Sequence, residues 1–157
     1  MKKKLQSIKI LFSDFDGVFT NNKVIVSEQG LESVICSRAD GIGVEILKQH
    51  KIEVIVISSE INNVVMQRSK KLKIKAYNNV KNKGDLITKI SKQKKIDLSN
   101  VGFIGNDIND LSALNLVGLP LIVKDSDLSL IKNNKFIKLN INGGEGVIRY
   151  IANLIVI

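Results

Sequence analysis

The chain has very few of the residues on which several classes of function depend. Its 157 residues include one cysteine, one histidine and no tryptophan. Cys36 has no second cysteine with which to form a disulfide, and no histidine lies near it in the sequence to activate a thiol nucleophile. We therefore expect Cys36 to be a small buried hydrophobic residue. His50, at the end of an expected helix, is more consistent with a partner for the helix dipole than with a metal ligand.

Aromatic residues and arginine are also scarce. Aromatic side chains make up 4% of the chain, and only Arg38, Arg68 and Arg149 among the 24 basic residues are arginine. The net charge of +9 would suit nucleic acid, but the basic residues do not alternate with stacking side chains. We therefore expect no nucleic-acid partner. A basic surface would still attract anionic phosphate substrates.

Long apolar segments are missing as well. No apolar run approaches the roughly 20 residues that a membrane-spanning helix needs. The basic start Met1–Lys4 leads into an expected strand rather than into a signal-like apolar segment. We expect a cytoplasmic protein with no membrane partner. Because repeats and low-complexity linkers are also missing, we expect residues 1–157 to form a single domain.

Short apolar runs alternate with amphipathic segments along the chain. We expect strands at about 8–13, 52–57, 74–77, 101–104, 118–123 and 136–139 and helices at about 40–50, 60–72, 83–95, 108–116, 126–133 and 145–155. Asp40 and Asp107 are candidate helix N-caps. The alternation predicts an α/β fold, a Rossmann-like doubly wound parallel sheet with right-handed crossovers.

The segment from Lys23 to Ser37 interrupts this alternation. Two short apolar runs flank the turn residues Ser27–Gly30, a pattern that predicts an inserted β-hairpin. A lone hairpin is only marginally stable in water, so we expect its apolar residues to pair with another surface.

Two acidic residues stand where the first apolar run ends. Asp14 and Asp16 follow Ile8–Phe12, which would place Asp14 at the carboxyl end of a parallel strand, where ligands bind in such sheets. Carboxylates this close repel each other unless a cation holds them. The alternative interpretation is that both are ordinary turn formers before Gly17.

The string Asp14–Thr20 resembles the first motif of the haloacid-dehalogenase-like phosphatases. The resemblance implies that Asp14 attacks phosphorus and that Asp16 is the general acid and base. It implies three further motifs at later strand ends: a Ser or Thr, a Lys, and an acidic loop led by Gly. Ser58, Lys83 and Gly105–Asp110 occur in this order.

Each of these three candidates has a plainer structural alternative. Ser58 could be a turn residue or a helix N-cap, and Lys83 could be a solvated surface lysine. An ammonium near a helix start is unfavourable unless an anion lies between them, which favours a phosphate-holding role for Lys83. The acidic loop could be a helix N-cap cluster, although that interpretation explains one acid better than four polar residues in six.

The resemblance also implies Mg²⁺ as cofactor. The implied ligands are Asp14, the backbone carbonyl of Asp16, and Asn106 or Asp107. In most members the residue directly after the loop glycine is Asp, whereas here it is Asn106, an uncharged but suitable ligand for a hard cation. Asp110 is expected to orient Lys83 or a metal-bound water.

Within this family the chain resembles the cap-less branch, and within that branch it is most similar to the phosphatases of 2-keto-3-deoxy sugar acids, which implies a role in surface-sugar biosynthesis. The implied substrate is a small molecule, either a nonulosonate 9-phosphate or 3-deoxy-manno-octulosonate 8-phosphate. The branch also implies a homotetramer, in which the hairpin joins copies and the active sites lie at subunit boundaries. The resemblance gives these substrate-binding candidates: Glu60, Arg68, Lys71, Gly143 and Gly144.

Two alternatives remain open for these assignments. Arg68 and Lys71, which lie three residues apart on one helix face, could be solvated helix charges, and Gly143–Gly144 could be a plain loop before a helix. The chain also resembles the phosphatase-like domain of cytidylyl-sialate synthetases, which implies a non-catalytic oligomerisation domain as the alternative function.

Overall fold

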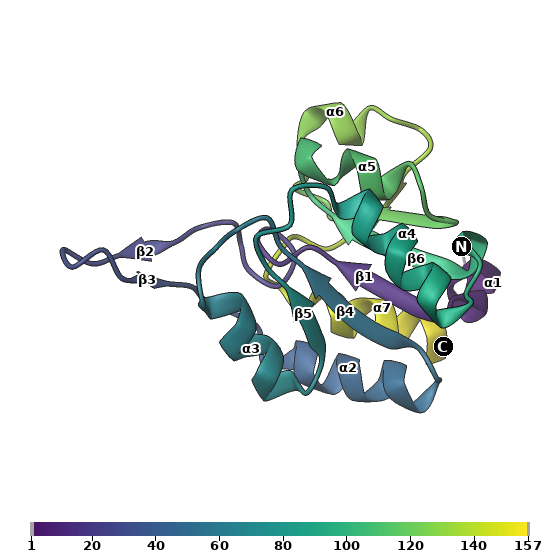
Figure 1. Ribbon diagram of the computed structural model, residues 1–157, viewed down its shortest axis with the longest axis horizontal. Helices are drawn as coiled ribbons and strands as arrows, with labels where there is room; N and C mark the ends of the chain where they lie inside the picture. Colours follow the sequence, from purple (N-terminus) through teal and green to yellow (C-terminus); the bar gives the residue numbers. More distant parts are fainter. Residues whose placement is uncertain (1, 157) are drawn as a thin grey trace.

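Apolar runs of the sequence form the central sheet of the protein. The computed structural model describes residues 2–156. Six strands lie in this sheet: β1 (Ile10–Ser13), β4 (Glu53–Ile57), β5 (Lys75–Tyr77), β6 (Val101–Gly105), β7 (Leu119–Ile122) and β8 (Ile137–Lys138). Figure 1 shows β1 running through the middle of the sheet, with both ends of the chain at its amino-terminal edge.

The strand order is β5-β4-β1-β6-β7-β8, and every pairing is parallel. Phe12 in β1 lies opposite Ile55 in β4 and Phe103 in β6. After β1 the chain adds β4 and β5 on one side, and it then returns to add β6, β7 and β8 on the other side. The order of the strands therefore switches between β1 and β6, and ligands bind in the crevice outside the carboxyl ends of the strands at such a point. The prediction of a doubly wound parallel sheet is confirmed.

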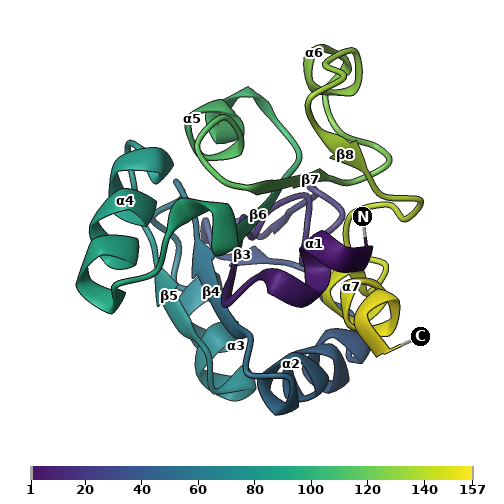
Figure 2. The ribbon, with the colours of Figure 1, turned by 90° about the vertical axis from the view of Figure 1, so that its right-hand side faces the viewer.

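Helices cover both faces of the sheet (Figure 2). One face carries α1 (Lys2–Ser7), α2 (Ala39–Gln49), α3 (Val64–Leu72) and α7 (Val147–Val156), and the other carries α4 (Lys83–Lys94), α5 (Leu111–Leu114) and α6 (Leu128–Ile131). Two 3₁₀ turns, η1 (Leu98–Asn100) and η2 (Ile108–Asp110), flank β6. Strand residues alternate between the two faces, since Leu11 packs in one apolar cluster and Phe12 in the other.

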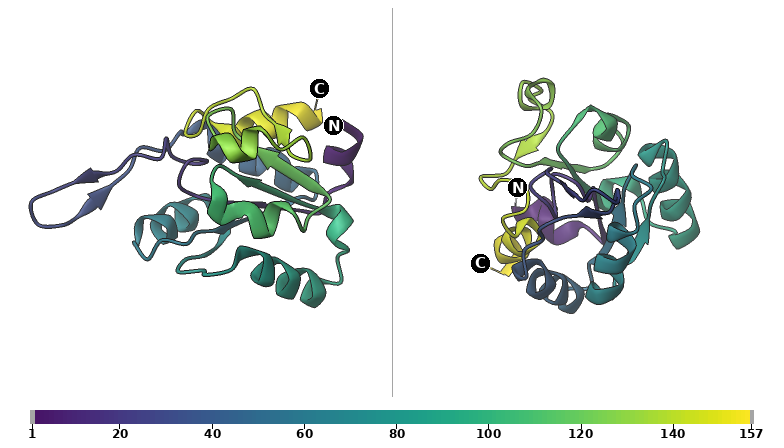
Figure 3. Two further views of the ribbon diagram at one scale, coloured as in Figure 1. Left: turned by 90° about the horizontal axis from the view of Figure 1, so that it is seen from above. Right: turned by 90° about the vertical axis from the view of Figure 1, so that its left-hand side faces the viewer.

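The predicted hairpin is present, with shorter strands than expected. Only β2 (Ile25–Val26) and β3 (Glu32–Ser33) pair, antiparallel. Figures 1 and 3 show this arm extending away from the body of the protein at the carboxyl edge of the sheet. Its apolar side chains are uncovered: Ile25 is 62% and Leu31 is 70% exposed.

Several element boundaries differ from expectation. The expected strand at 8–13 begins at Ile10, because Lys2–Ser7 forms α1, whose Leu5 is buried against the core. Helix α3 begins at Val64 rather than near residue 60, because the loop after β4 continues further. None of the helices within residues 2–156 combines the length and the apolar character that a bilayer crossing requires.

The N-cap prediction for Asp40 is wrong. Asp40 lies in the first turn of α2, and its carboxylate Oδ1 instead accepts hydrogen bonds from the Ile148 and Arg149 amides, at 2.9 and 3.4 Å. Asp40 therefore satisfies free N–H groups of α7, more than 100 residues away in the sequence. Burial raises the pKa of Asp40 to about 6, although the two amide bonds lower it.

Candidate active site

The turn after β1 carries the first carboxylate of the site. The Asp14 amide donates to the Ile104 carbonyl at 2.9 Å, which ties the strand end to β6. Oxygen Oδ1 of Asp14 accepts from the Phe15 amide at 2.7 Å. Asp14 is buried, so the side chain is held in one place with Oδ2 left for a second contact.

Lys83 makes that second contact. The lysine is the first residue of α4 and its side chain is 1% exposed. Its Nζ lies 2.8 Å from Asp14 Oδ2 and 2.7 Å from Asp110 Oδ1. One buried ammonium thus bridges two buried carboxylates, which excludes a solvated role for Lys83.

The charges of this cluster shift its pKa values. Burial and the nearby Asp110 raise the pKa of Asp14 to about 7, against the lowering effect of Lys83. Burial alone would lower the pKa of Lys83, but Asp14 and Asp110 together raise it above its ordinary value. Lys83 therefore stays protonated, and a further cation beside Asp14 would favour the carboxylate form.

Asp110 connects this cluster to the loop after β6. Its Oδ2 accepts from the amides of Asn106 and Asp107, at 2.8 and 3.3 Å. Asp107 Oδ1 in turn accepts from the Ile108 amide, so Asp107 and Asp110 form a capping box around η2. The N-cap prediction for Asp107 is confirmed, and its carboxylate is engaged at the helix start.

Asp16 lies on the tight turn that follows Asp14. The Thr20 hydroxyl organises this turn: it donates to Asp16 Oδ1 at 3.4 Å and accepts from the Gly17 amide at 3.2 Å. Asp16 Oδ2 is buried and has no hydrogen-bond partner among the described residues. Partial burial and the nearby Glu60 raise the pKa of Asp16, which helps it to hold a proton.

These groups border a cleft of about 370 Å³ at the carboxyl edge of the sheet. Its lining residues are Asp14, Asp16, Asn22, Ser58, Ser59, Glu60, Asn106, Asp107, Ile108 and Asn109. Ser58 follows β4, and its Oγ accepts from the Glu60 amide at 3.1 Å, which leaves the hydroxyl proton to donate elsewhere. Four separate segments therefore contribute polar groups to the cleft: the turn after β1, the start of the hairpin, the loop after β4 and the loop after β6. The start of α4 contributes Lys83, which lies behind Asp14.

Four predicted substrate-binding residues do not line this cleft. Arg68 and Lys71 line another hollow, of about 800 Å³, between the hairpin base, α2 and α3, where Arg68 Nη2 donates to the Ser37 carbonyl at 2.8 Å. Gly143 and Gly144 lie against the backbone of the Asp16 turn. Their predicted role in substrate binding stays a prediction.

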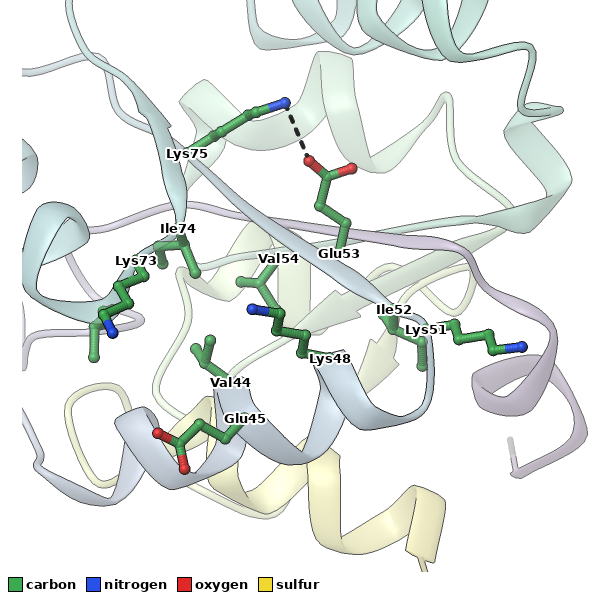
Figure 4. A pocket seen from close by; sticks show the side chains of 11 residues that line it. Val44, Glu45, Lys48, Lys51, Ile52, Glu53, Val54, Lys73, Ile74 and Lys75 are labelled. Atoms are coloured by element: carbon green, nitrogen blue, oxygen red, sulfur yellow. Dashed lines mark ion pairs between the residues drawn. The ribbon is translucent and has the colours of Figure 1, made fainter.

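A further hollow, shown in Figure 4, shares no lining residue with this cleft. It has a volume of about 550 Å³ between α2 and the strands β4 and β5. Five apolar side chains, four lysines and two glutamates line it, and Lys75 pairs with Glu53 at 3.4 Å. The paired carboxylates and buried lysine lie elsewhere, so the smaller cleft is the candidate active site.

The cleft suits a hard divalent cation. The available donors are oxygens, from the carboxylate of Asp14, the backbone carbonyl of Asp16 and the amide of Asn106, a set that Mg²⁺ prefers. Asp16 Oδ2 has no hydrogen-bond partner among the described residues, and the pKa of Asp14 is raised although Lys83 lies beside it. Both observations indicate that the residues around the two carboxylates do not fully balance their negative charge, which a bound cation would do. No three His, Cys, Asp or Glu side chains gather as a metal cluster within residues 2–156, so backbone and amide oxygens would be needed.

A doubly wound parallel sheet, with two carboxylates after its first strand and a buried lysine beside them, defines a hydrolase of the phosphoryl-transfer class. The chain belongs to the haloacid dehalogenase-like hydrolase family, whose model matches residues 45–151. The matched segment includes Ser58, Lys83 and Asp110 and begins after Asp14 and Asp16.

Curated and solved relatives agree with this family. The 3-deoxy-D-manno-octulosonate 8-phosphate phosphatase KdsC of Haemophilus influenzae is 28% identical over 156 residues, which cover 99% of this chain and 86% of that protein. The same enzyme from Moraxella catarrhalis, solved with a magnesium ion, a phosphate ion and a KDO molecule, is 26% identical with a TM-score of 0.90, and the match covers 99% of this chain and 89% of that one. The prediction of a phosphoric monoester hydrolase is confirmed.

One relative is a cytidylyltransferase rather than a phosphatase by name. The N-acylneuraminate cytidylyltransferase of Oncorhynchus mykiss is 27% identical over 138 residues. The match covers 85% of this chain but 32% of that protein. The chain thus resembles one part of a longer cytidylyltransferase.

Sequence reasoning missed two residues around the site. Thr20 was part of the recognised motif but received no role, although its hydroxyl bonds three groups of the turn. Asp125 follows the apolar run at 118–123 as Asp14 follows the first run, so its place after a strand was the available signal. Its Oδ1 accepts from the Gly143 amide at 2.8 Å.

Proposed function

We propose that the protein hydrolyses the phosphate ester of a 2-keto-3-deoxy sugar acid through a phosphorylated Asp14. The observation that carries this proposal is the bridge of Lys83 Nζ between Asp14 and Asp110, with Asp16 at the same cleft. A relic site would have no reason to retain a buried ammonium between two buried carboxylates, because such a cluster costs desolvation energy.

The chain's own residues supply the chemical steps. Asp14 Oδ attacks phosphorus, forming an acyl phosphate, and the bond from phosphorus to the sugar oxygen breaks. Asp16 gives its proton to the departing oxygen and then takes a proton from the water that attacks the acyl phosphate. That attack releases inorganic phosphate and restores Asp14. Ser58 and Lys83 stabilise the charge on the transferring oxygens, and Asp110 orients Lys83.

The proposed cofactor is Mg²⁺, held by Asp14, the Asp16 carbonyl and Asn106. When bound, Mg²⁺ offsets the repulsion between an anionic nucleophile and an anionic phosphate. Asn106 is the better candidate than Asp107 because it is buried beside Gly17, whereas the Asp107 carboxylate caps η2. The magnesium bound to the Moraxella relative supports this choice of cation.

The substrate class rests on the named relatives and on the cleft. The similarity to the KdsC phosphatases supports 3-deoxy-D-manno-octulosonate 8-phosphate as the substrate, and the match to the acylneuraminate enzyme favours a nonulosonate 9-phosphate as the second candidate. Glu60 lines the cleft and is placed to accept from sugar hydroxyls.

We also propose that the protein is a homotetramer joined through the hairpin arm, defined as residues 23–37. The exposed apolar side chains of this arm support the proposal, because an uncovered hairpin favours association. Arg68 and Lys71 do not line the cleft of their own subunit. In the tetramer they would bind substrate only in the cleft of a neighbouring subunit. Gel filtration should show an assembly well above 17.4 kDa, and a fully active monomer would contradict the tetramer.

A phosphate-release screen tests the function. Purified protein with Mg²⁺ should release phosphate from 3-deoxy-manno-octulosonate 8-phosphate or a nonulosonate 9-phosphate. Asp14→Asn should abolish the release, because an amide of the same shape cannot form the acyl phosphate. Asp85→Asn, on the exposed side of the first turn of α4, is the matched control and should keep wild-type activity. If the wild type is inactive on all sugar acid phosphates, the non-catalytic oligomerisation domain becomes the better account.

A further inference from the structure

Gly17 is closely packed by backbone and side chain. It has φ of +80°, and a Cβ there would lie 2.0 Å from Asn106 Nδ2. A Cβ on Gly143 would lie 2.1 Å from the Gly17 carbonyl oxygen. Gly17 therefore contacts both the Asn106 amide and Gly143, with no room for an added side chain at either contact.

The next glycine continues the contact. Gly144 has φ of +78° and donates its amide to the Val18 carbonyl at 2.9 Å. A Cβ on Gly144 would lie 2.7 Å from the Asn21 amide nitrogen. The loop 143–144 therefore contacts residues 17, 18, 20 and 21 of the turn.

The loop that follows β7 is hydrogen-bonded to both neighbours of Gly17, the 141–144 segment and Asn106. Asp125 Oδ1 accepts from the Gly143 amide at 2.8 Å, and the Lys124 amide donates to the Ile141 carbonyl at 2.9 Å. The Asp127 amide donates to the Asn106 carbonyl at 2.8 Å. Of these three hydrogen bonds, only the one from the Gly143 amide to Asp125 involves a side chain, so a substitution can remove it.

We propose that Asp125 is a positioning residue for the general acid. By holding the Gly143 amide, Asp125 keeps the loop 143–144 pressed against the Gly17 turn and so fixes the neighbouring Asp16. The role of Asp16 as general acid rests on the proposed function. The packing of loop 143–144 against the Gly17 turn rests on the contacts described above. Asp125 is exposed and does not line the cleft, so it acts only through this loop.

The consequence concerns the leaving group. Proton donation by Asp16 matters most for an alkyl phosphate, whose alkoxide is a poor leaving group, and least for an aryl phosphate with an acidic phenol. A loosened Asp16 turn should therefore slow alkyl phosphate hydrolysis more than aryl phosphate hydrolysis. A general loss of folded protein would lower both rates equally.

Steady-state kinetics of Asp125→Ala and Asp125→Asn test this consequence. For a sugar acid phosphate, Asp125→Ala should lower kcat about tenfold with KM within about twofold, and for an aryl phosphate it should lower kcat at most about twofold. Asp125→Asn keeps an acceptor oxygen and should restore near wild-type rates. Asp97→Ala is the matched control, because Asp97 Oδ1 also accepts one backbone amide at 2.8 Å but lies at the amino end of β6. Equal losses on both substrates, no loss, or failure of Asp125→Asn to rescue would overturn the proposal.

Hydrogen exchange gives a readout that does not depend on substrate. Amides of residues 17–21 and 143–144 should exchange faster in Asp125→Ala than in the wild type, Asp125→Asn or Asp97→Ala. Gly143→Ala, which places a methyl against the Gly17 carbonyl, should raise exchange in the same residues. Unchanged exchange in Asp125→Ala would refute the support by Asp125. If the wild type hydrolyses neither phosphate, the proposed function fails while exchange still decides whether Asp125 holds the turn.

Discussion

Replacing Lys83 by Met should destabilise the protein in a pH-dependent way. The variant removes the ammonium that lies 2.8 Å from Asp14 and 2.7 Å from Asp110 and leaves two buried carboxylates without their shared partner. Breaking a buried ion pair by removing one partner costs about 3–5 kcal/mol. Since folded domains are stable by about 5–15 kcal/mol, the variant should still fold.

The loss should depend on the protonation of Asp14. Its pKa is about 7 with Lys83 present, where burial and Asp110 raise it and Lys83 lowers it. Without Lys83 that pKa moves further up. A carboxyl with a raised pKa in the folded state stabilises the protein below its unfolded pKa, and this contribution is lost as pH rises through the folded value. Asp14 is protonated below about pH 7 in both folded proteins, so the loss caused by the variant should be constant there and grow above pH 7, being larger at pH 8 than at pH 5 by about 1 kcal/mol.

Urea unfolding followed by circular dichroism at pH 5 and pH 8 measures both effects. Lys89→Met is the matched control, because Lys89 is exposed on the same helix and its loss should cost less than about 0.5 kcal/mol. A loss below about 1 kcal/mol at pH 8, or the same loss at both pH values, would show that Lys83 does not compensate these two carboxylates.

Two further predictions concern the proposed metal position and the buried carboxyl of Asp40. Asn106→Asp should lower the Mg²⁺ concentration for half-maximal activity and tighten Mg²⁺ binding in calorimetry, by about 1–4 kcal/mol or roughly one to three decades. Asp107→Ala should leave the half-maximal Mg²⁺ concentration and the Mg²⁺ affinity within about twofold of wild type, because the Asp107 carboxylate caps η2. An unchanged metal response in Asn106→Asp would mean that the proposed metal position is wrong. Burial raises the pKa of Asp40 to about 6, so wild-type stability should fall by up to about 3 kcal/mol relative to Asp40→Asn between pH 4 and pH 7. Parallel unfolding curves for the two proteins across this range would refute that assignment.

The sequence could predict the parts of the site that depend on local pattern. Asp14 and Ser58 follow apolar runs, and parallel strands bring their carboxyl ends to one edge, so their convergence follows from the fold class. Lys83 begins a helix whose N-cap Asn82 accepts from Asp85, a local signal that is also readable. Family resemblance then supplied the chemical roles.

Contacts between distant segments could not be predicted in this way. Asp40 has a helix-start pattern, yet it caps α7, because the close packing of α2 on α7 puts free amides within its reach. Arg68 shares a helix face with Lys71 as expected, but the direction of α3 turns both away from their own cleft. The helix at Lys2–Ser7 lacks a strong periodic signal and forms where Leu5 packs against α7.

The central claim is that Asp14 becomes phosphorylated. Rapid acid quenching of wild-type protein with a sugar acid phosphate that carries a radiolabelled phosphoryl group tests it directly. The account predicts label bound covalently to the protein, released by hydroxylamine as an acyl phosphate would be, and absent from Asp14→Asn. Phosphate release without bound label, or label that persists in Asp14→Asn, would contradict the account.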